Sequence, residues 1–226
     1  MTQYIPVRTT TRKDCEALHT TYKKAKNSLG KGSFGEVYEA CIRGNHDCGY
    51  VLKVITYDSK TFKESGGKSL ERYYRDWYNE AKVFSALNKC QEKKRLVFSP
   101  ILYDRWYCAE GRKDKSTVVH FYLLMERYDG DLLQLFTDRD LTFKNIVIAM
   151  ALERMDSYLS IIHDTCKICL NDIKLQNILY KRVGEYDYDL VFADFGISSR
   201  HSDDECIKND RENFKELKEQ FRARSR

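Results

Sequence analysis

A glycine-rich segment early in this chain leads directly into a strand-like pattern, and this order limits the folds that can contain it. Gly30, Gly32 and Gly35 have the spacing Gly-x-Gly-x-x-Gly. The following residues, 36–40, have the alternating character of a half-buried strand. In a dinucleotide-binding fold the same motif would open a helix. The segment therefore predicts a glycine-rich hairpin, in which backbone amides can approach phosphates without a Cβ in the way; an ordinary hairpin turn is the alternative.

Four further motifs follow this segment in a fixed order. The first, Val51-Leu52-Lys53-Val54, places a lysine in an apolar strand, with Val51 and Lys53 on one face. A lysine in such a strand is costly unless it is paired. Glu80, on the next predicted helix, is the preferred partner, and Glu71 is the alternative. The remaining motifs are Asp172-Ile173-Lys174-Leu175-Gln176-Asn177 and Asp194-Phe195-Gly196.

Taken together and in this order, the motifs resemble the signature set of protein kinases. The resemblance covers residues 26–200 and is tightest from His163 to Leu179. It implies an α+β, bilobal protein-kinase-like fold with a truncated C-terminal lobe, with ATP and Mg²⁺ as cofactors. It also implies a protein substrate, and it allows an activating protein partner. Similar compact kinases include the kinase subunit of the KEOPS complex, bacterial effector kinases and kinases of large DNA viruses.

The resemblance implies a chemical role for each residue that matches a motif of the family. Asp172 would orient the attacking hydroxyl and accept its proton, and Lys174 would neutralise charge on the transferred phosphoryl group. A lysine two residues after the aspartate is similar to Ser/Thr kinases more than to Tyr kinases. The implied catalytic residues are Asp172, Lys174, Lys53 and Glu80, and the implied Mg²⁺ ligands are Asn177 and Asp194.

The resemblance also implies a binding surface for the nucleotide. Met125 would be the gatekeeper beside adenine, the backbone of Glu126 and Tyr128 would meet the base, and Asp131 would reach the ribose. The implied ATP-binding residues are Leu29, Gly30, Lys31, Gly32, Ser33, Phe34, Gly35, Val37, Val51, Lys53, Met125, Glu126, Tyr128 and Asp131.

Hydrophobic periodicity divides the chain into a strand-rich part and a helix-rich part. We expect an N-terminal extension over residues 1–25, an N-lobe over 26–127, and a short C-lobe over 128–226 that ends in a helix-F-like segment. A cleft is expected near Met125 to Asp131. The predicted strands cover 37–42, 50–55, 97–106, 118–125, 178–180 and 190–193; the predicted helices cover 70–87, 132–136, 142–163 and 210–221; a turn over 44–47 and a polar loop over 57–69 are also expected.

The chain departs from the family pattern at two places. Leu170-Asn171 stands where the family has His-Arg, and no Ala-Pro-Glu motif follows Asp194-Phe195-Gly196. Both departures predict that activation-loop phosphorylation does not switch this protein. Asp210 has two readings, either as a substitute for a buried helix aspartate that holds the catalytic loop, or as a helix cap, which aspartate forms well.

Composition excludes several other classes of protein. The 226 residues carry a net charge of +5, which is too mild to indicate nucleic acid as a partner. No apolar stretch is long enough for a membrane span, and residues 1–12 lack a secretory apolar region. Of the eight cysteines only Cys166 and Cys169 have the spacing Cys-x-x-Cys, and a zinc site would need a second ligand pair. Reduced thiols and an intracellular, cytoplasmic location are therefore expected.

Two functions from other classes remain open beside an active protein kinase. The chain can be a kinase-fold binding module whose catalysis is vestigial, because the platform that normally holds a substrate is missing from the sequence. For the same reason it can be a small-molecule kinase or an ATPase. The intact set of chemical residues favours an active protein kinase of Ser/Thr type.

Overall fold

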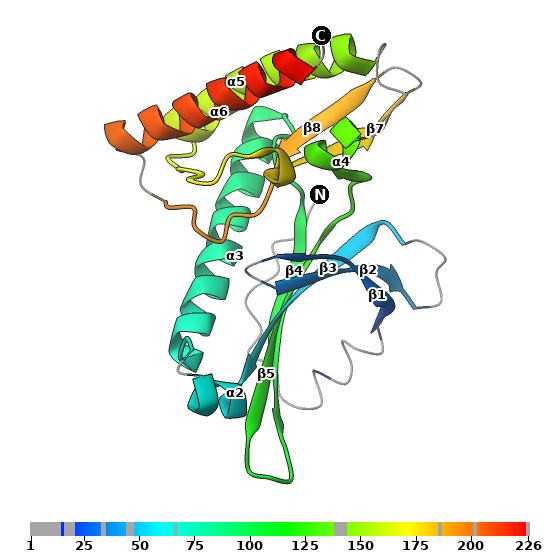
Figure 1. Ribbon diagram of the computed structural model, residues 1–226, viewed down its shortest axis with the longest axis vertical. Helices are drawn as coiled ribbons and strands as arrows, with labels where there is room; N and C mark the ends of the chain where they lie inside the picture. Colours follow the sequence, from blue (N-terminus) through cyan, green and yellow to red (C-terminus); the bar gives the residue numbers. More distant parts are fainter. Residues whose placement is uncertain are drawn as a thin grey trace. The chain divides into compact units, whose positions relative to one another are not determined.

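The computed structural model describes residues 15, 21–32, 35–43, 48–65, 67–137, 144–184, 187–200 and 203–224. The chain forms two compact units. The first consists of the residues up to Ala81 together with Ile101–Arg127, and the second of Lys82–Pro100 together with Tyr128–Arg226. Strands and helices build both units (Figure 1), which confirms the predicted α+β class. Residues 82–100 were expected in the N-lobe but group with the second unit, because their side chains and backbone are bonded to it.

The first unit contains an antiparallel sheet of five strands in the order β1-β2-β3-β5-β4. These strands are β1 (Tyr22–Gly32), β2 (Gly35–Ile42), β3 (Tyr50–Asp58), β4 (Leu102–Gly111) and β5 (Thr117–Glu126). β1 begins at Tyr22, within the predicted extension, because Tyr22 pairs with Ile42 at the far end of β2. β4 begins only at Leu102, because the backbone N–H groups of Phe98 and Ser99 donate to the side chain of Gln91 instead of joining the sheet.

The strand register gives this sheet two distinct faces. Val37, Lys53 and Leu123 lie opposite one another on β2, β3 and β5, so their side chains share one face. The first part of α3 (Leu70–Lys94) covers this face, and its buried Trp77 packs against aromatic rings of β4 and β5. The lysine therefore lies on the face that the helix covers.

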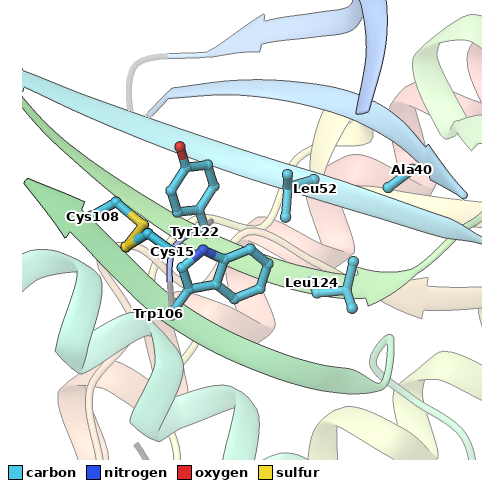
Figure 2. Close-up of a cluster of buried hydrophobic side chains, with 7 residues drawn as sticks. All are labelled: Cys15, Ala40, Leu52, Trp106, Cys108, Tyr122 and Leu124. Atoms are coloured by element: carbon cyan, nitrogen blue, oxygen red, sulfur yellow. A yellow bond between two sulfur atoms is a disulfide. The ribbon is translucent and has the colours of Figure 1, made fainter. Parts of the chain in front are cut away.

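The opposite face carries a compact hydrophobic cluster (Figure 2). Its members are Cys15, Ala40, Leu52, Trp106, Cys108, Tyr122 and Leu124. The rings of Trp106 and Tyr122 stack with their centroids 5.0 Å apart. Burial among these side chains raises the pKa of Tyr122 to about 12. Cys15 lies in the predicted N-terminal extension, yet it is part of this core.

The second unit combines helices with a small sheet of three strands in the order β6-β7-β8. Its elements are β6 (Gly130–Asp131), α4 (Leu132–Thr137), α5 (Lys144–Asp164), η1 (Leu175–Asn177), β7 (Ile178–Arg182), β8 (Tyr188–Phe192) and α6 (Asp204–Arg224). α5 and α6 run side by side (Figure 1), joined by ion pairs from Lys218 to Glu153 and Asp156. The predicted apolar face of the last helix is buried, as expected, at Phe214, Leu217 and Phe221.

Three predicted boundaries need correction. The helix expected over residues 70–87 continues to Lys94 as α3. The other two corrections are a loop that contains a helix and a helix that begins earlier, and local hydrogen bonds give the reason. The loop expected over residues 57–69 contains α2 (Ser59–Ser65), whose start is capped by the Asp58 carboxylate as it accepts from the N–H of Lys60. α6 begins six residues before the predicted position, because Asp203 caps it by accepting from the N–H of Cys206. The predicted turn over residues 44–47 lies outside the described residues.

The expectation of reduced cysteines is wrong. All eight cysteines are paired, as Cys15–Cys108, Cys41–Cys48, Cys90–Cys166 and Cys169–Cys206. Three of these bonds join residues that are far apart in the sequence, so residue spacing carries no signal for them. Because disulfides form and persist in oxidising surroundings, the argument for a reducing intracellular compartment loses its basis. In the described part of the chain, no helix has both the length and the apolar character that crossing a membrane requires.

Candidate active site

The hairpin between β1 and β2 ends in the pair Gly32 and Gly35. Gly35 has φ +136°, and a Cβ at this position would lie 2.5 Å from the carbonyl oxygen of Val54, so only glycine fits. A Cβ added to Gly30 would meet nothing within 4 Å, which leaves open space beside the backbone. Ser33 and Phe34, predicted to contact phosphates at the tip of this hairpin, lie outside the described residues.

Charged side chains along this hairpin pair with one another. Lys31 lies 3.0 Å from the carboxylate of Glu36, which also accepts from the hydroxyl of Tyr38. The Tyr38 hydroxyl, and then Lys31, lower the pKa of Glu36. The ammonium of Lys24 lies 3.3 Å from the centroid of the Tyr38 ring, and burial lowers its pKa. Leu29 is exposed, so an apolar side chain is presented to solvent at the hairpin.

Lys53 and Glu80 form a buried ion pair within the first unit. The Lys53 ammonium lies 2.7 Å from the Glu80 carboxylate, and the two side chains are 8% and 1% exposed. A buried charge needs such a partner, because desolvation would otherwise be very costly. Glu71, the alternative partner, is exposed and pairs with Arg75 instead. The preferred pairing from the sequence is therefore the one that the structure contains.

Replacing Glu80 by glutamine is expected to lower the free energy of unfolding by about 2 kcal/mol. The amide can still accept a hydrogen bond, but it no longer balances the buried ammonium of Lys53. Chemical denaturation without reductant measures the change. Glu71→Gln, on the exposed side of the same helix, is the matched control and is expected to change stability by less than about 0.5 kcal/mol. Equal effects of the two substitutions would contradict a stabilising role for the buried pair.

The residues expected to contact adenine divide between the two units. Val51 lies opposite Met125 in the pairing of β3 and β5, and Met125 is buried. Glu126 ends β5 and donates its N–H to the carbonyl of Ile101 at 2.9 Å. Tyr128 belongs to the second unit, where it is buried and the ammonium of Lys181 lies 5.7 Å from its ring centroid.

Asp131, expected to reach a ribose, has a structural role at the start of α4. Its carboxylate accepts from the N–H of Gln134 at 2.8 Å, while the Gln134 side chain accepts from the Asp131 N–H at 3.4 Å. This reciprocal arrangement is a capping box. The spacing Asp-x-x-Gln before an apolar helix is a sequence signal for this motif.

Asp172, Lys174 and Asn177 form a hydrogen-bonded cluster in the second unit. The Asp172 carboxylate accepts from the Lys174 ammonium at 2.6 Å and from the Asn177 amide nitrogen at 2.8 Å. The same amide nitrogen lies 2.9 Å from the backbone oxygen of Asp172. Since the nitrogen faces Asp172, the amide oxygen of Asn177 is the end available to a cation. The sequence motif thus folds into one compact group of polar atoms.

Asp194 follows β8 and adopts the left-handed conformation, with φ +58°. The N–H of Ala193 donates to the carbonyl of Asn177 at 2.8 Å, so the chain before Asp194 is hydrogen-bonded to the last residue of η1. The next residue, Phe195, packs edge-on against Phe84 with their ring centroids 4.7 Å apart. A backbone hydrogen bond before Asp194 and a ring contact after it thus fix the chain on both sides of this residue.

Asp210 fixes the backbone of the loop that carries Asp172. Its carboxylate is completely buried and accepts from the N–H groups of Leu170 and Asn171, both at 2.8 Å. The same carboxylate lies 2.8 Å from the ring nitrogen of the buried His163. Because α6 begins at Asp204, the alternative reading of Asp210 as a helix cap is wrong.

Asn171, at the position where the family pattern has arginine, contacts the segment that follows Asp-Phe-Gly. It has φ +62°, a left-handed conformation that asparagine tolerates better than most residues. Its side chain donates to the carbonyl of Ile197 at 3.1 Å, and Ser198 donates to the carbonyl of Leu170 at 2.8 Å. The segment after Asp-Phe-Gly is therefore bound directly to the catalytic loop.

These groups fit the cofactors that the family implies. Mg²⁺ prefers carboxylate and amide oxygens, and Asn177 and Asp194 offer both kinds. The open hairpin around Gly30 leaves backbone accessible to phosphates.

Comparison with known protein families matches the protein kinase domain over residues 23–214. No curated protein matches the chain. The matched range contains the glycine-rich hairpin, the Lys53–Glu80 pair, the Asp172 cluster and Asp210. The chain is therefore a member of the protein kinase domain family.

Proposed function

We propose that this protein transfers the γ-phosphoryl group of ATP to serine or threonine hydroxyls of protein substrates. The observation that carries the proposal is the Asp172–Lys174–Asn177 cluster, held on a loop that the buried Asp210 anchors. Phosphoryl transfer needs positioning and charge neutralisation more than covalent chemistry. A preformed group of this kind supplies both.

Each residue of the cluster has a separate task in this proposal. Asp172 orients the acceptor hydroxyl and takes its proton, and the hydrogen bond from Asn177 keeps its carboxylate in place. Lys174 lies within hydrogen-bond reach of the same carboxylate and offsets negative charge on the transferred group. Asn177 and Asp194 hold Mg²⁺. When bound, the metal neutralises phosphate charge and orients the phosphates.

The first unit supplies the nucleotide contacts in this proposal. Lys53 binds the α- and β-phosphates, and Glu80 holds its ammonium in position. The backbone of the hairpin at Gly30 and Gly32 approaches the phosphates, and Val37 and Val51 pack on adenine. Val37 lies opposite Lys53 in the pairing of β2 and β3, which supports a shared binding face.

The proposed kinase is not switched by phosphorylation of an activation loop. Only a few residues separate Asp-Phe-Gly from the start of α6. Hydrogen bonds from the side chains of Asn171 and Ser198 join this segment to the catalytic loop, and no phosphate is needed for them. Asn171 occupies the position at which the family has the arginine that would bind such a phosphate. A protein partner or a change in the chain itself would then have to supply any regulation.

The test uses purified protein with Mg²⁺, γ-labelled ATP and general protein substrates, without reductant. We expect label on substrate as phosphoserine and phosphothreonine, and complete loss of labelling when a chelator removes the metal. Phosphotyrosine alone would contradict the Ser/Thr assignment. Hydrolysis of ATP with no labelled protein would favour the small-molecule kinase or ATPase, and thermal stabilisation by Mg-ATP with no turnover would favour a binding module.

A further inference from the structure

The disulfide between Cys169 and Cys206 lies at the catalytic loop. Cys169 immediately precedes Leu170 and Asn171, the two residues whose backbone N–H groups bind Asp210. Cys206 is in the first turn of α6, one helical turn before Asp210. The two sulfur atoms and a carboxylate oxygen of Asp210 all lie within 4.8 Å of one another. The covalent link and the hydrogen-bonded link therefore join the same two segments.

Further contacts extend this junction to the segment after Asp-Phe-Gly. Cys169 and Ser199 exchange two backbone hydrogen bonds of 3.0 Å each. The sulfur of Cys206 lies 3.5 Å from the side-chain oxygen of Asn171, whose amide nitrogen binds Ile197. The disulfide is thus in contact with both the loop that carries Asp172 and the backbone that follows Asp194, so a change in the disulfide can displace both segments.

We propose that Cys169–Cys206 is a thiol–disulfide switch that sets the activity of the kinase site. The oxidised form fixes the catalytic loop to α6 and is the active form. Reduction releases the loop and slows phosphoryl transfer. The catalytic part of this inference rests on the proposed kinase function, whereas the release of the loop does not.

Reduction of the Cys169–Cys206 disulfide proceeds by exchange with a dithiol reductant. A thiolate of the dithiol attacks the sulfur of Cys206, which is the less buried of the two cysteines. The Cys169–Cys206 bond breaks, and Cys169 leaves as a thiolate that takes a proton. The second thiolate of the dithiol then attacks the first sulfur of the dithiol, which is bonded to Cys206 in the mixed disulfide. Cys206 is released as a thiolate that takes a proton. Two electrons pass to the protein, and the reductant becomes a disulfide.

Reduction is expected to loosen the loop for two physical reasons. Two unbonded sulfur atoms require a separation of roughly 3.5–4 Å, whereas bonded sulfurs lie at about 2 Å. Cys169 is fully buried beside the Asp210 carboxylate, so it has little room to move without displacing Leu170. Any thiolate at Cys169 is also repelled by that carboxylate. Both effects weaken the hydrogen bonds from Leu170 and Asn171 to Asp210.

The experiment compares Cys169→Ser/Cys206→Ser with Cys41→Ser/Cys48→Ser, which removes one of the two disulfides of the first unit. Two quantities are measured without reductant, namely kcat for phosphate transfer and hydrogen exchange at the Leu170 and Asn171 amides. The first variant is expected to lose at least about tenfold in kcat, since small misplacements of reacting groups cost that much or more. Its two amides are expected to exchange at least about tenfold faster, and the control variant is expected to match the wild type in both.

Wild-type protein under graded dithiol reduction gives a second, independent measurement. Alkylation and mass spectrometry identify which disulfides have opened at each step, and kcat is expected to fall with the opening of Cys169–Cys206. Unchanged amide exchange and unchanged activity after this bond opens would overturn the switch, as would free thiols at Cys169 and Cys206 in protein purified without reductant. Faster amide exchange in a protein that never transfers phosphate would uphold the release of the loop and would overturn the proposed kinase function instead.

Discussion

Replacing Asp172 by asparagine is expected to lower kcat for phosphate transfer by about 10²–10⁴-fold, the contribution typical of a positioned general base. Asparagine has the same shape, but its amide carries no charge and cannot take a proton from the acceptor hydroxyl. The hydrogen bond from Lys174 to this position loses its charged acceptor, so the positive charge of the Lys174 ammonium is no longer balanced by this side chain. The expected loss is therefore one of chemistry, with the fold retained.

Labelled ATP and a protein substrate measure the rate, and a thermal shift with Mg-ATP measures nucleotide binding. Stabilisation by Mg-ATP is expected to remain in Asp172→Asn, because the proposed phosphate contacts of Lys53 are unchanged. Asp189→Asn, at an exposed position of β8 in the same unit, is the matched control and is expected to keep wild-type kcat. Wild-type turnover in Asp172→Asn would remove Asp172 from the mechanism and would favour a different use of this site.

Replacing Asp210 by alanine is expected to lower the free energy of unfolding by about 3–5 kcal/mol, as removal of one partner from a buried charged group does. The carboxylate accepts from the buried N–H of Leu170, from the part-buried N–H of Asn171 and from the ring of the buried His163. Alanine offers none of these bonds, and each buried donor that loses its acceptor costs about 1–3 kcal/mol. Urea unfolding without reductant measures the change.

Asp210→Asn retains one acceptor oxygen, and we expect it to cost about half as much as the alanine substitution, which provides a folded variant for kinetics. Asn209→Ala changes an exposed neighbour on the same helix and is expected to alter stability by less than about 0.5 kcal/mol. If Asp210→Ala were as stable as Asn209→Ala, the hydrogen bonds to the loop would contribute nothing and the anchoring role would fail. If kcat of Asp210→Asn falls by more than its folded fraction does, the result would support a role of Asp210 in positioning the catalytic loop.

Several features of the site could be predicted because their signals are local in the sequence. The pairing of Lys53 with Glu80 followed from the cost of burying an unpaired lysine, and the structure contains that pair at 2.7 Å. The apolar faces of α3 and α6 followed from helical spacing and are buried as expected. The motif from Asp172 to Asn177 is so short that its residues can meet without help from distant parts of the chain.

Other features depend on segments that are remote in sequence, and the sequence alone did not reveal them. Asp210 could be read equally well as a cap or as a buried anchor, because only the packing of α6 decides which groups its carboxylate meets. Asn171 gained its role from Ile197, which folds back on the catalytic loop.

The sequence by itself determined the family and the α+β class, because fixed motif order and hydrophobic periodicity are properties of the linear chain. Only the tertiary structure decided the state of the cysteines and the anchoring of the catalytic loop. Cys169 and Cys206 carry no spacing signal, yet folding brings them together beside Asp210. Contacts between residues far apart in the chain are fixed by packing, and packing is what residue spacing cannot report.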